Sequence, residues 1–253
     1  MSFVPRLFLP SLSNSDQEVI LDESLSKYLV KVLRFEEKGR FLGFDSNGFE
    51  YELVLRKADP KQAVATIIRK KEKKELNGRL FIALAQSLPK GPKMDLILRQ
   101  CTEAGAHQFI PLVTQRSVSR PEESQFDHKN NRWQKILVEA CRQCGRNDIP
   151  LLDSVTSWES VLKLFSEFDL VLLPYEKEAP TLKTVLESKN TIRRILILVG
   201  PEGGWSKAEV NEAEEMGAFA VHLPTPILRT ETAGVAVISM IQFFASHFAN
   251  PLE

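Results

Sequence analysis

The pattern of hydrophobic and polar positions changes between residues 70 and 80. Before this point, apolar residues occur in short alternating stretches separated by turn residues, which is typical of β-strands. After it, short continuous apolar runs alternate with segments whose apolar residues recur every three or four positions, as on one face of a helix. Strands separated by helices favour a mostly parallel sheet. The chain is therefore expected to form an α/β fold preceded by a β-rich N-terminal part.

The N-terminal pattern predicts a small β-rich barrel or sheet. Asn47 and Gly48 separate the apolar stretches 40–44 and 49–55, and this pair tolerates the positive φ that a tight hairpin needs. Residues 63–68 are expected to form another strand. A short helix is expected at residues 25–33, with one apolar face made of Leu25, Leu29, Val32 and Leu33. The charged run 70–75, followed by Asn77 and Gly78, is the expected linker.

The C-terminal pattern predicts strands alternating with helices. The expected strands are residues 80–85, 109–113, 169–174, 194–199 and 219–223. The expected helices are residues 94–104, residues 133–144, a helix that ends near Gly217, and the apolar segment 232–248. Ser206 and Glu209 form a capping-box pattern at the start of the third helix.

Composition narrows the class of protein. The 253 residues are 43% hydrophobic and 26% charged, with 33 basic and 33 acidic side chains, so the chain is neither globally disordered nor a polycation. The longest apolar run, residues 195–199, is far short of the ~20 residues that cross a bilayer. No secretory signal is visible, and three cysteines cannot build a disulfide framework, so a reducing cytoplasm is the expected location.

Cysteine and histidine give no metal signature. Cys141 and Cys144 have a C-x-x-C spacing, but a zinc site needs about four ligands and no suitable pair accompanies them. Both lie on the apolar face of a predicted helix, where burial is expected. His222 lies in an apolar strand and is expected to be a core histidine.

The segment 198–206 is the first that carries chemistry. An apolar strand leads into a glycine-rich turn and then into a capped helix. Ligands of α/β sheets bind beyond the carboxyl ends of strands, and glycines let backbone groups approach a ligand closely. The segment is neither a Walker A nor a G-x-G-x-x-G motif. By itself it could also be a plain tight turn.

The segment 224–234 is the second. It leads from a strand through a proline-containing loop into the final helix, with Arg229, Thr230, Glu231 and Thr232 at the helix start. An arginine is unusual there because a helix N-terminus is partially positive. Arg229 is therefore expected to serve an anion or a developing negative charge. Thr230 and Glu231 could instead be structural, Thr230 as a helix cap.

Residues 200–204 (Gly-Pro-Glu-Gly-Gly) followed by residues 228–233 (Leu-Arg-Thr-Glu-Thr-Ala) resemble the bacterial small-subunit (16S) ribosomal RNA uridine-N3 methyltransferases of the SPOUT class. Four further stretches share the resemblance, which spans essentially the whole chain: residues 5–8, 32–34, 93–105 and 144–150.

The resemblance implies a fold and an activity. It implies a PUA-like RNA-binding β-barrel at residues 1–72 and a trefoil-knotted α/β methyltransferase domain at residues 78–253. The implied reaction is methylation of N3 of a uridine in the decoding region of 16S ribosomal RNA with S-adenosylmethionine as the cofactor. The family further implies a homodimer that acts on the assembled small subunit, without a metal or a membrane.

Site residues follow from the motifs. Arg229 is the expected catalytic residue, stabilising negative charge that spreads onto the uracil carbonyl oxygens as the N3 proton leaves. Glu231 is a possible general base. The expected cofactor-binding residues are Leu173, Pro174, Val199, Gly200, Glu202, Gly203, Leu223, Ile227, Leu228 and Thr232. The expected RNA-binding residues are Arg6, Arg34, Lys93, Arg146 and Asn147, with Lys31, Arg116 and Arg142 as weaker candidates.

Two alternatives stay open. The same fold could serve a non-catalytic RNA-binding factor in ribosome assembly, or a ribose 2′-O-methyltransferase. Cofactor binding separates the first alternative from an enzyme, and the modified atom separates the second.

Overall fold

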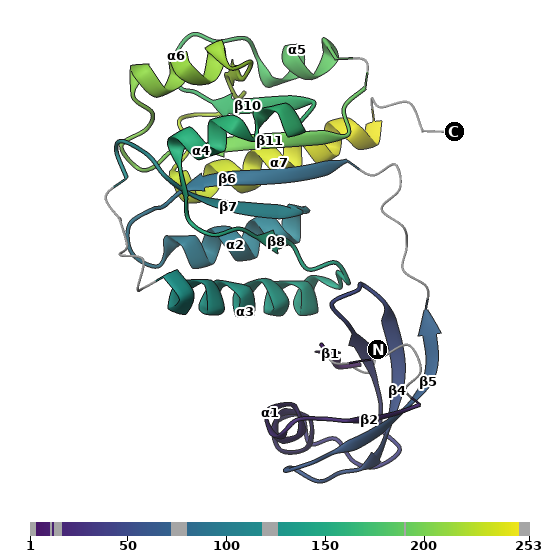
Figure 1. The fold of residues 1–253 in the computed structure, drawn as a ribbon. Helices are drawn as coiled ribbons and strands as arrows, with labels where there is room; N and C mark the ends of the chain where they lie inside the picture. Colours follow the sequence, from purple (N-terminus) through teal and green to yellow (C-terminus); the bar gives the residue numbers. More distant parts are fainter. Residues whose placement is uncertain are drawn as a thin grey trace. The chain divides into compact units, whose positions relative to one another are not determined.

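The computed structural model describes residues 4–10, 12, 17–71, 80–117, 126–189 and 191–247. Contacts divide the chain into two compact units. One contains Met1–Glu75 with Cys141–Ile149, and the other contains Leu76–Ala140 with Pro150–Glu253 (Figure 1). Residues 70 and 71 of the expected linker belong to a strand, and the rest of that linker lies outside the described residues.

The first unit contains a five-stranded sheet. In spatial order its strands are β1 (Arg6–Phe8), β3 (Arg40–Phe44), β4 (Glu50–Lys57), β5 (Val64–Lys71) and β2 (Glu18–Ile20). β1 and β3 are parallel, and the other neighbouring strands are antiparallel. The predicted hairpin joins β3 to β4, and Gly48 has a φ of 83°. The β-rich prediction is confirmed, whereas closure into a PUA-like barrel stays a prediction.

The predicted helix of the first unit has an irregular second half. It begins as α1 (Glu23–Lys27) and continues as the π-helical turn η1 (Tyr28–Val32), where the Leu33 N–H donates to the Tyr28 carbonyl five residues earlier. The wider turn changes which side chains face the core. Leu29 is fully buried as predicted, but Val32 is 66% exposed, so the predicted apolar face was wrong at that position.

The second unit contains a parallel sheet of seven strands. Six of them lie in the order β12 (Phe219–Val221), β10 (Leu170–Pro174), β11 (Arg194–Val199), β6 (Phe81–Ser87), β7 (Gln108–Val113) and β8 (Leu151–Leu152), and β9 (Thr156–Ser157) also pairs with β7. Every pairing within it is parallel, which confirms the predicted α/β class. The carboxyl ends of these strands therefore share one edge.

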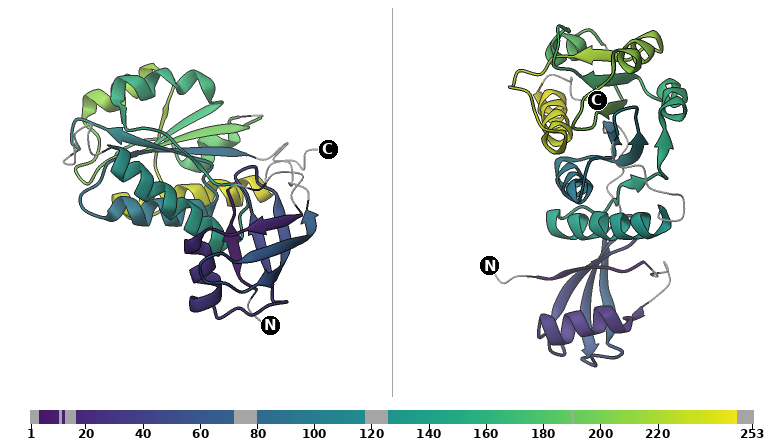
Figure 2. Two further views of the ribbon diagram at one scale, coloured as in Figure 1. Left: turned by 60° about the horizontal axis from the view of Figure 1, so that its bottom comes forward. Right: turned by 90° about the vertical axis from the view of Figure 1, so that its left-hand side faces the viewer.

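Helices cover both faces of this sheet (Figure 2). They are α2 (Lys93–Ala104), α3 (Phe126–Cys144), α4 (Trp158–Lys163), α5 (Leu182–Glu187), α6 (Lys207–Glu215) and α7 (Thr230–His247). The short helices α4 and α5 were not predicted, because their six residues give little periodicity. α7 packs against α2 and against strands β6 and β11, while Trp158 and Val210 from α4 and α6 belong to a hydrophobic core with strand residues.

Only one of the two cysteines near the end of α3 is buried. Burial raises the pKa of the Cys141 thiol to about 12, so this thiol stays protonated. Cys144, the last helical residue, is exposed, which corrects the prediction that both cysteines are buried.

Among the described residues, no helix is long and apolar enough to span a membrane.

Candidate functional site

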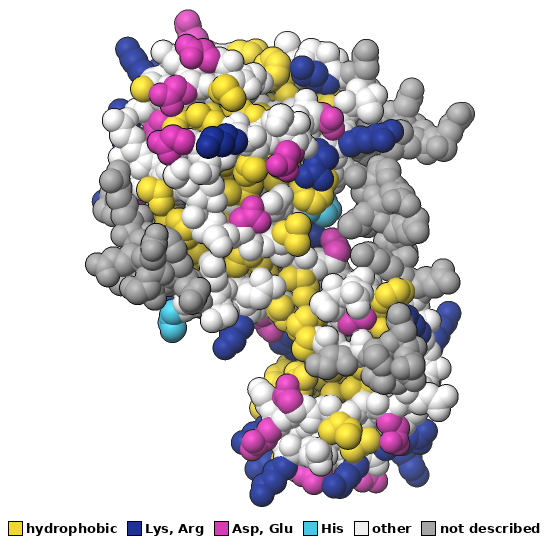
Figure 3. Space-filling model, in the orientation of Figure 1, with side chains coloured by type: hydrophobic (Ala, Val, Ile, Leu, Met, Phe, Trp, Pro, Cys, Tyr) yellow, Lys and Arg dark blue, Asp and Glu magenta, His cyan; other side chains and the backbone are white. Residues whose placement is uncertain are grey.

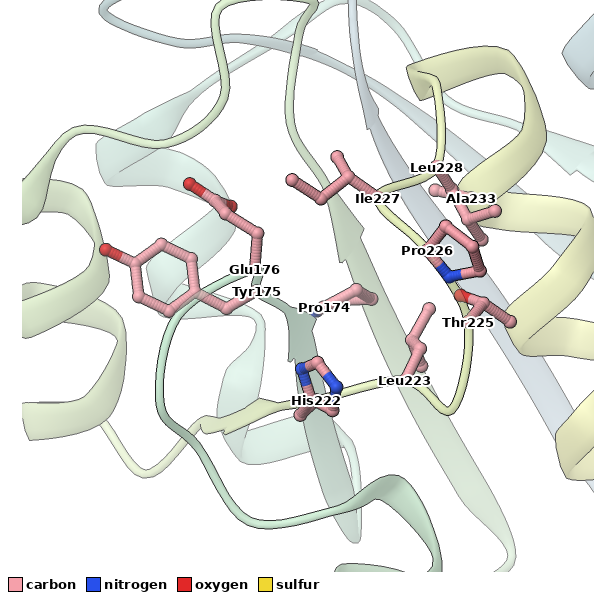
Figure 4. A pocket seen from close by; sticks show the side chains of 10 residues that line it. All are labelled: Pro174, Tyr175, Glu176, His222, Leu223, Thr225, Pro226, Ile227, Leu228 and Ala233. Carbon is pink, nitrogen blue, oxygen red and sulfur yellow. The ribbon is translucent and has the colours of Figure 1, made fainter.

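The carboxyl edge of the parallel sheet carries a pocket. It lies where β10 and β12 end, and it encloses about 480 Å³ of space that is partly open to solvent. Figure 4 shows Tyr175 and Glu176 on one side and Thr225, Pro226 and Ala233 on the other, with Pro174 and Leu223 between them. The remaining lining residues are His222, Ile227 and Leu228. Segments far apart in the sequence thus meet here because parallel strands end on the same side.

Four of the predicted cofactor-binding residues line this pocket: Pro174, Leu223, Ile227 and Leu228. Ile227 is 83% exposed, an uncommon position for a large apolar side chain. The other predicted residues, which do not line it, are Leu173, Val199, Gly200, Glu202, Gly203 and Thr232. Leu173 and Val199 are core residues of β10 and β11.

Three lining residues were not expected from the sequence: Tyr175, Glu176 and His222. They directly follow the ends of β10 and β12, which is the signal that could have identified them. The other lining residues outside the predicted list, Thr225, Pro226 and Ala233, lie in the predicted segment 224–234. His222 corrects an expectation, because β12 ends at Val221 and the His222 side chain is exposed rather than part of the core.

The glycine-rich loop after β11 is held by hydrogen bonds to its carbonyl groups. The Thr230 hydroxyl donates to the Gly200 carbonyl at 2.6 Å. The Arg116 guanidinium donates to the Gly203 and Trp205 carbonyls at 2.8 and 3.2 Å. Because these backbone acceptors are already paired, the loop has a defined conformation before any ligand arrives.

The far end of the same loop is fixed by a buried carboxylate. The predicted capping box is present, since Glu209 accepts from the Ser206 N–H at 2.8 Å and the Ser206 hydroxyl accepts from the Glu209 N–H. Glu209 also accepts from the Gln115 N–H at 2.8 Å. The cap therefore connects the start of α6 to the loop that follows β7.

Lys93 bridges two carboxylates of the predicted site. Its ammonium lies 3.0 Å from Glu202 and 3.2 Å from Glu231. Hydrogen bonds to both carboxylates raise the pKa of Lys93. The pKa of Glu231 is lowered by its own backbone N–H and by Lys93, against a smaller opposing effect of burial. Partial burial alone would raise the pKa of Glu202, but its own N–H, Lys93 and the Lys90 N–H more than offset this, and the pKa is lowered.

Arg229 immediately precedes α7. Its carbonyl accepts the N–H groups of Thr232 and Ala233, both at 2.9 Å, so its backbone begins the helix. Its side chain is exposed and makes no hydrogen bond or ion pair with any residue that the structure describes. Its positive charge also contributes to the lowered pKa of Glu231. The exposed guanidinium is therefore accessible to a ligand at the positive end of a helix.

The predicted RNA-binding residues differ sharply in exposure. Arg34 is exposed and has the left-handed φ of 55°. Arg6 is only 8% exposed, and its guanidinium donates to the carbonyls of Cys141 and Arg146 and to the Asn147 side chain. Its two terminal nitrogens are thus used within the first unit, where they bind the segment Cys141–Ile149, and this geometry does not favour a phosphate contact by Arg6.

The other basic candidates are also partly engaged. Arg146 is half-buried and donates to Asp148 at 2.6 Å, and Arg142 donates to the Tyr28 hydroxyl at 2.7 Å. Lys31 is exposed. On the face shown in Figure 3, basic and acidic side chains are interspersed rather than separated into patches of one sign. Within the described ranges, no group of three or more His, Cys, Asp or Glu side chains could hold a metal ion.

A parallel α/β sheet with a small-molecule pocket beyond its carboxyl edge defines the class: an α/β protein that takes a ligand at the strand ends. Comparison with known proteins gives the family. The model of the RNA methyltransferase domain matches residues 77–242, and the chain belongs to this family.

Individual relatives agree over nearly the whole length. The ribosomal RNA small subunit methyltransferase E of Bacillus subtilis (strain 168) is 32% identical over 240 residues, which cover 92% of this chain and 90% of that protein. The protein of the same name from Aquifex aeolicus is 32% identical over 89% of this chain and 94% of its own length. The crystal structure of a ribosomal RNA small subunit methyltransferase E from Neisseria gonorrhoeae, bound to S-adenosyl methionine, superimposes with a TM-score of 0.85 at 30% identity and covers 96% of this chain and 98% of that one.

Proposed function

We propose that this protein is an S-adenosylmethionine-dependent methyltransferase that acts on small-subunit (16S) ribosomal RNA, at N3 of a uridine. The observation that carries the proposal is the pocket at the carboxyl edge of the sheet, which is lined by residues that follow β10 and β12 and by residues of the segment 224–234. The names of the relatives support the cofactor and the RNA class.

The residues of the pocket fit this cofactor. Pro174, Leu223 and Leu228 provide an apolar wall of the kind that accepts an adenine ring. Glu176 adds a carboxylate that suits hydroxyl groups or a positive charge, and Thr225 adds a hydroxyl. When bound, S-adenosylmethionine supplies a methyl group activated by its sulfonium. The other predicted residues would support this site from the ends of β10 and β11, from the glycine-rich loop and from the first turn of α7: Leu173, Val199, Gly200, Glu202, Gly203 and Thr232.

The protein's own contribution is positioning and charge stabilisation. A uracil ring that loses its N3 proton carries negative charge on its flanking carbonyl oxygens, and the unpaired Arg229 guanidinium would stabilise it. Arginine does not act as a proton acceptor, because its guanidinium stays protonated at neutral pH. Glu231 is also a poor acceptor, since its pKa is lowered and Lys93 pairs with it. We therefore assign Glu231 a structural role in the first turn of α7.

The remaining parts of the proposal concern the substrate and the assembly. Residues 1–72 would form a PUA-like RNA-binding domain in which Arg34 is the most accessible candidate. Arg146 and Asn147 are further candidates in the segment Cys141–Ile149, which groups with the first unit. Residues 78–253 would form a trefoil-knotted SPOUT domain that pairs with a second copy as a homodimer. The substrate would be the assembled small subunit in the cytoplasm.

The test is a methyl-transfer assay with labelled S-adenosylmethionine and small subunits from a strain that lacks this protein. Nucleoside mass spectrometry should detect 3-methyluridine. Labelled ribose 2′-O-methylnucleosides would contradict the N3 assignment, and the absence of both transfer and cofactor binding would instead favour a non-catalytic RNA-binding factor.

A further inference from the structure

Gln86 is a fully buried polar side chain that no step of the proposed reaction uses. It lies near the carboxyl end of β6, in register with Val199, the last residue of β11. Burying an amide is costly unless its groups are hydrogen-bonded. The question is therefore which groups Gln86 binds at this place.

The Gln86 amide is the first donor in a series of two hydrogen bonds, and each bond can have its donor on only one side. Gln86 Nε2 lies 3.0 Å from Thr230 Oγ1, and Thr230 Oγ1 lies 2.6 Å from the Gly200 carbonyl oxygen. A carbonyl only accepts, so the single hydroxyl proton of Thr230 points to Gly200. The Thr230 oxygen must then accept from Gln86, and the group facing it must be the amide N–H.

The NH2 group of the Gln86 amide makes hydrogen bonds, whereas its oxygen makes none among the described residues. Nε2 also donates to the Ser87 carbonyl at 2.9 Å. The oxygen Oε1 is buried and has no hydrogen-bond partner among the described residues. An unpaired buried oxygen makes glutamine an expensive residue for filling space, since an apolar side chain of similar size would avoid this cost.

These hydrogen bonds lie where the connections of the sheet diverge. β6 and β11 are neighbouring strands, but the polypeptide continues from β6 to β7 on one side and from β11 toward β12 on the other. Ligand sites of open α/β sheets form where the connections diverge in this way. Here, Gln86 from β6, Gly200 after β11 and Thr230 at the start of α7 meet across that point.

We propose that Gln86 is a positioning residue for the methyl donor: acting through Thr230, it fixes the Gly200 carbonyl and thereby the glycine-rich loop beside the cofactor pocket. This inference rests on the proposed function, which assigns that loop to S-adenosylmethionine. Gln86 itself does not touch the ligand. Without its N–H, the Thr230 hydroxyl loses the donor that orients it, and the loop can adopt other conformations.

The test compares variants of the two side chains in this series of hydrogen bonds, Gln86 and Thr230. Gln86→Met keeps the length of the side chain without the donor, Thr230→Val keeps the shape without the hydroxyl, and Thr230→Ser keeps the hydroxyl. The first two should weaken S-adenosylmethionine binding about tenfold by calorimetry and raise its KM equally with a much smaller change in kcat. Thr230→Ser should bind like the wild type. The double variant Gln86→Met/Thr230→Val should bind no more weakly than either single variant, because both break one chain.

A matched control separates positioning from stability. Ser26 is also a fully buried hydroxyl that links two backbone groups, but it lies in the first unit. Ser26→Ala should lower Tm without changing the Kd for S-adenosylmethionine. Unchanged Kd and KM in Gln86→Met or Thr230→Val would overturn the inference, as would additive effects in the double variant. If Gln86→Met does not fold, the Thr230 pair decides. If the wild type does not bind S-adenosylmethionine, the proposed function itself fails, which is a distinct result.

Discussion

At the residue scale, Arg229 is set apart by what it lacks. Most charged groups around the glycine-rich loop are paired: Lys93 with two carboxylates, and Arg116 with two carbonyls. The Arg229 guanidinium is exposed and makes no hydrogen bond or ion pair in the described part of the chain, although its charge helps to lower the pKa of Glu231. It also lies next to a helix start whose partial charge is positive. Such a group contributes little to folding, so a substitution there should report on function.

Arg229→Ala should therefore retain the wild-type Tm and the Kd for S-adenosylmethionine while the single-turnover rate of methyl transfer falls by about 10²- to 10³-fold, the typical loss for one stabilising donor. Arg229→Lys should lose less, because a point charge remains at the position. Single-turnover assays with small subunits measure both. A wild-type rate in Arg229→Ala would remove this residue from the mechanism.

Arg34 is distinguished by its backbone. It follows the π-helical turn η1 with a φ of 55°, a conformation that costs an L-residue about 1–2 kcal/mol relative to glycine. π-Helical turns and strained non-glycine residues both occur often at functional sites. An arginine at a position where glycine would be easier suggests that the side chain is used.

Arg34→Gly should thus separate stability from binding. The free energy of unfolding is expected to stay equal or rise by up to about 1 kcal/mol, because glycine relieves the strain while adding entropy to the unfolded chain. RNA affinity should fall, and the slope of log Kd against log salt should decrease by about 1. Urea unfolding and salt-dependent RNA titrations measure the two effects.

Lys38 is the matched control, since it is exposed in the same unit and has a φ of 69°. Lys38→Gly should change stability in the same way and leave the salt slope unaltered. Equal salt slopes for Arg34→Gly and the wild type would show that Arg34 makes no phosphate contact.

At the scale of elements, the ion pairs of Lys93 join three segments: the start of α2, the glycine-rich loop through Glu202 and the first turn of α7 through Glu231. The lowered pKa values of both carboxylates mean that their stabilising contribution is present at neutral pH and is lost as the pH falls below about 4. The raised pKa of Lys93 means that its contribution is lost as the pH rises above about 10.

Lys93→Met should remove the loss of stability at low pH and the loss of stability at high pH that these ion pairs cause. The Tm of the wild type should exceed that of the variant most between about pH 5 and 10, and the two should converge at both extremes. Scanning calorimetry from pH 3 to 11 measures this. Lys207, an exposed lysine at the start of α6, gives the control Lys207→Met, which should follow the wild type. A pH-independent difference for Lys93→Met would mean that the ion pairs do not act.

Sequence patterns identified the long elements and missed the short ones for a physical reason. Strand β11 was predicted with its observed bounds, because a continuous apolar run suits a strand buried on both faces. Val32 and His222 were placed wrongly because a π-helical turn and an early strand end cannot be seen in apolar spacing. Gln86 was missed because its role depends on Thr230, 144 residues later in the chain.

The close packing of α7 on the sheet depends on one glycine. A Cβ on Gly234 would lie 3.1 Å from Leu84 Cδ2 and 3.2 Å from Cys101 Sγ, tighter than ordinary contact. Gly234→Val should therefore destabilise the protein by about 1–3 kcal/mol, as overpacking does. Ser239→Val places the same valine side chain on the exposed side of the same helix and should be nearly neutral. Equal stabilities of the two variants in urea would contradict this packing.

At the scale of the whole molecule, the contacts of Arg6 explain why the sequence predicted one boundary between the domains and did not reveal that a later segment groups with the first unit. The segment Cys141–Ile149 follows the methyltransferase pattern in sequence but groups with the first unit, because the buried Arg6 guanidinium binds its carbonyls. A contact 135 residues away in sequence has no local signal. The same reason applies to the trefoil knot, since a threaded connection changes no local pattern and only the family resemblance suggests it.

The predicted homodimer can be argued from the surface of α7 and α2, which pack together in the second unit. Phe243 on α7 is 61% exposed and Leu96 on α2 is 39% exposed, so each of these two packed helices presents a large apolar side chain at the surface. Pairing with a second copy would bury them at about 25 cal/mol for each Å² of apolar surface. Phe243→Glu would place a charge in that interface and should shift the protein from dimer to monomer at micromolar concentration, measured by sedimentation equilibrium.

Met216 gives the control, because it is 53% exposed at the end of α6 and so tests whether any exposed apolar residue has this effect. Met216→Glu should remain a dimer, as the wild type is expected to be. A monomeric wild type would contradict the homodimer, and a dimeric Phe243→Glu would place the interface on a different surface. Because Arg229, the proposed catalytic residue, is adjacent to α7, the same variant shows whether methyl transfer depends on the dimer. A monomer that keeps the wild-type rate would mean that one chain forms the complete site.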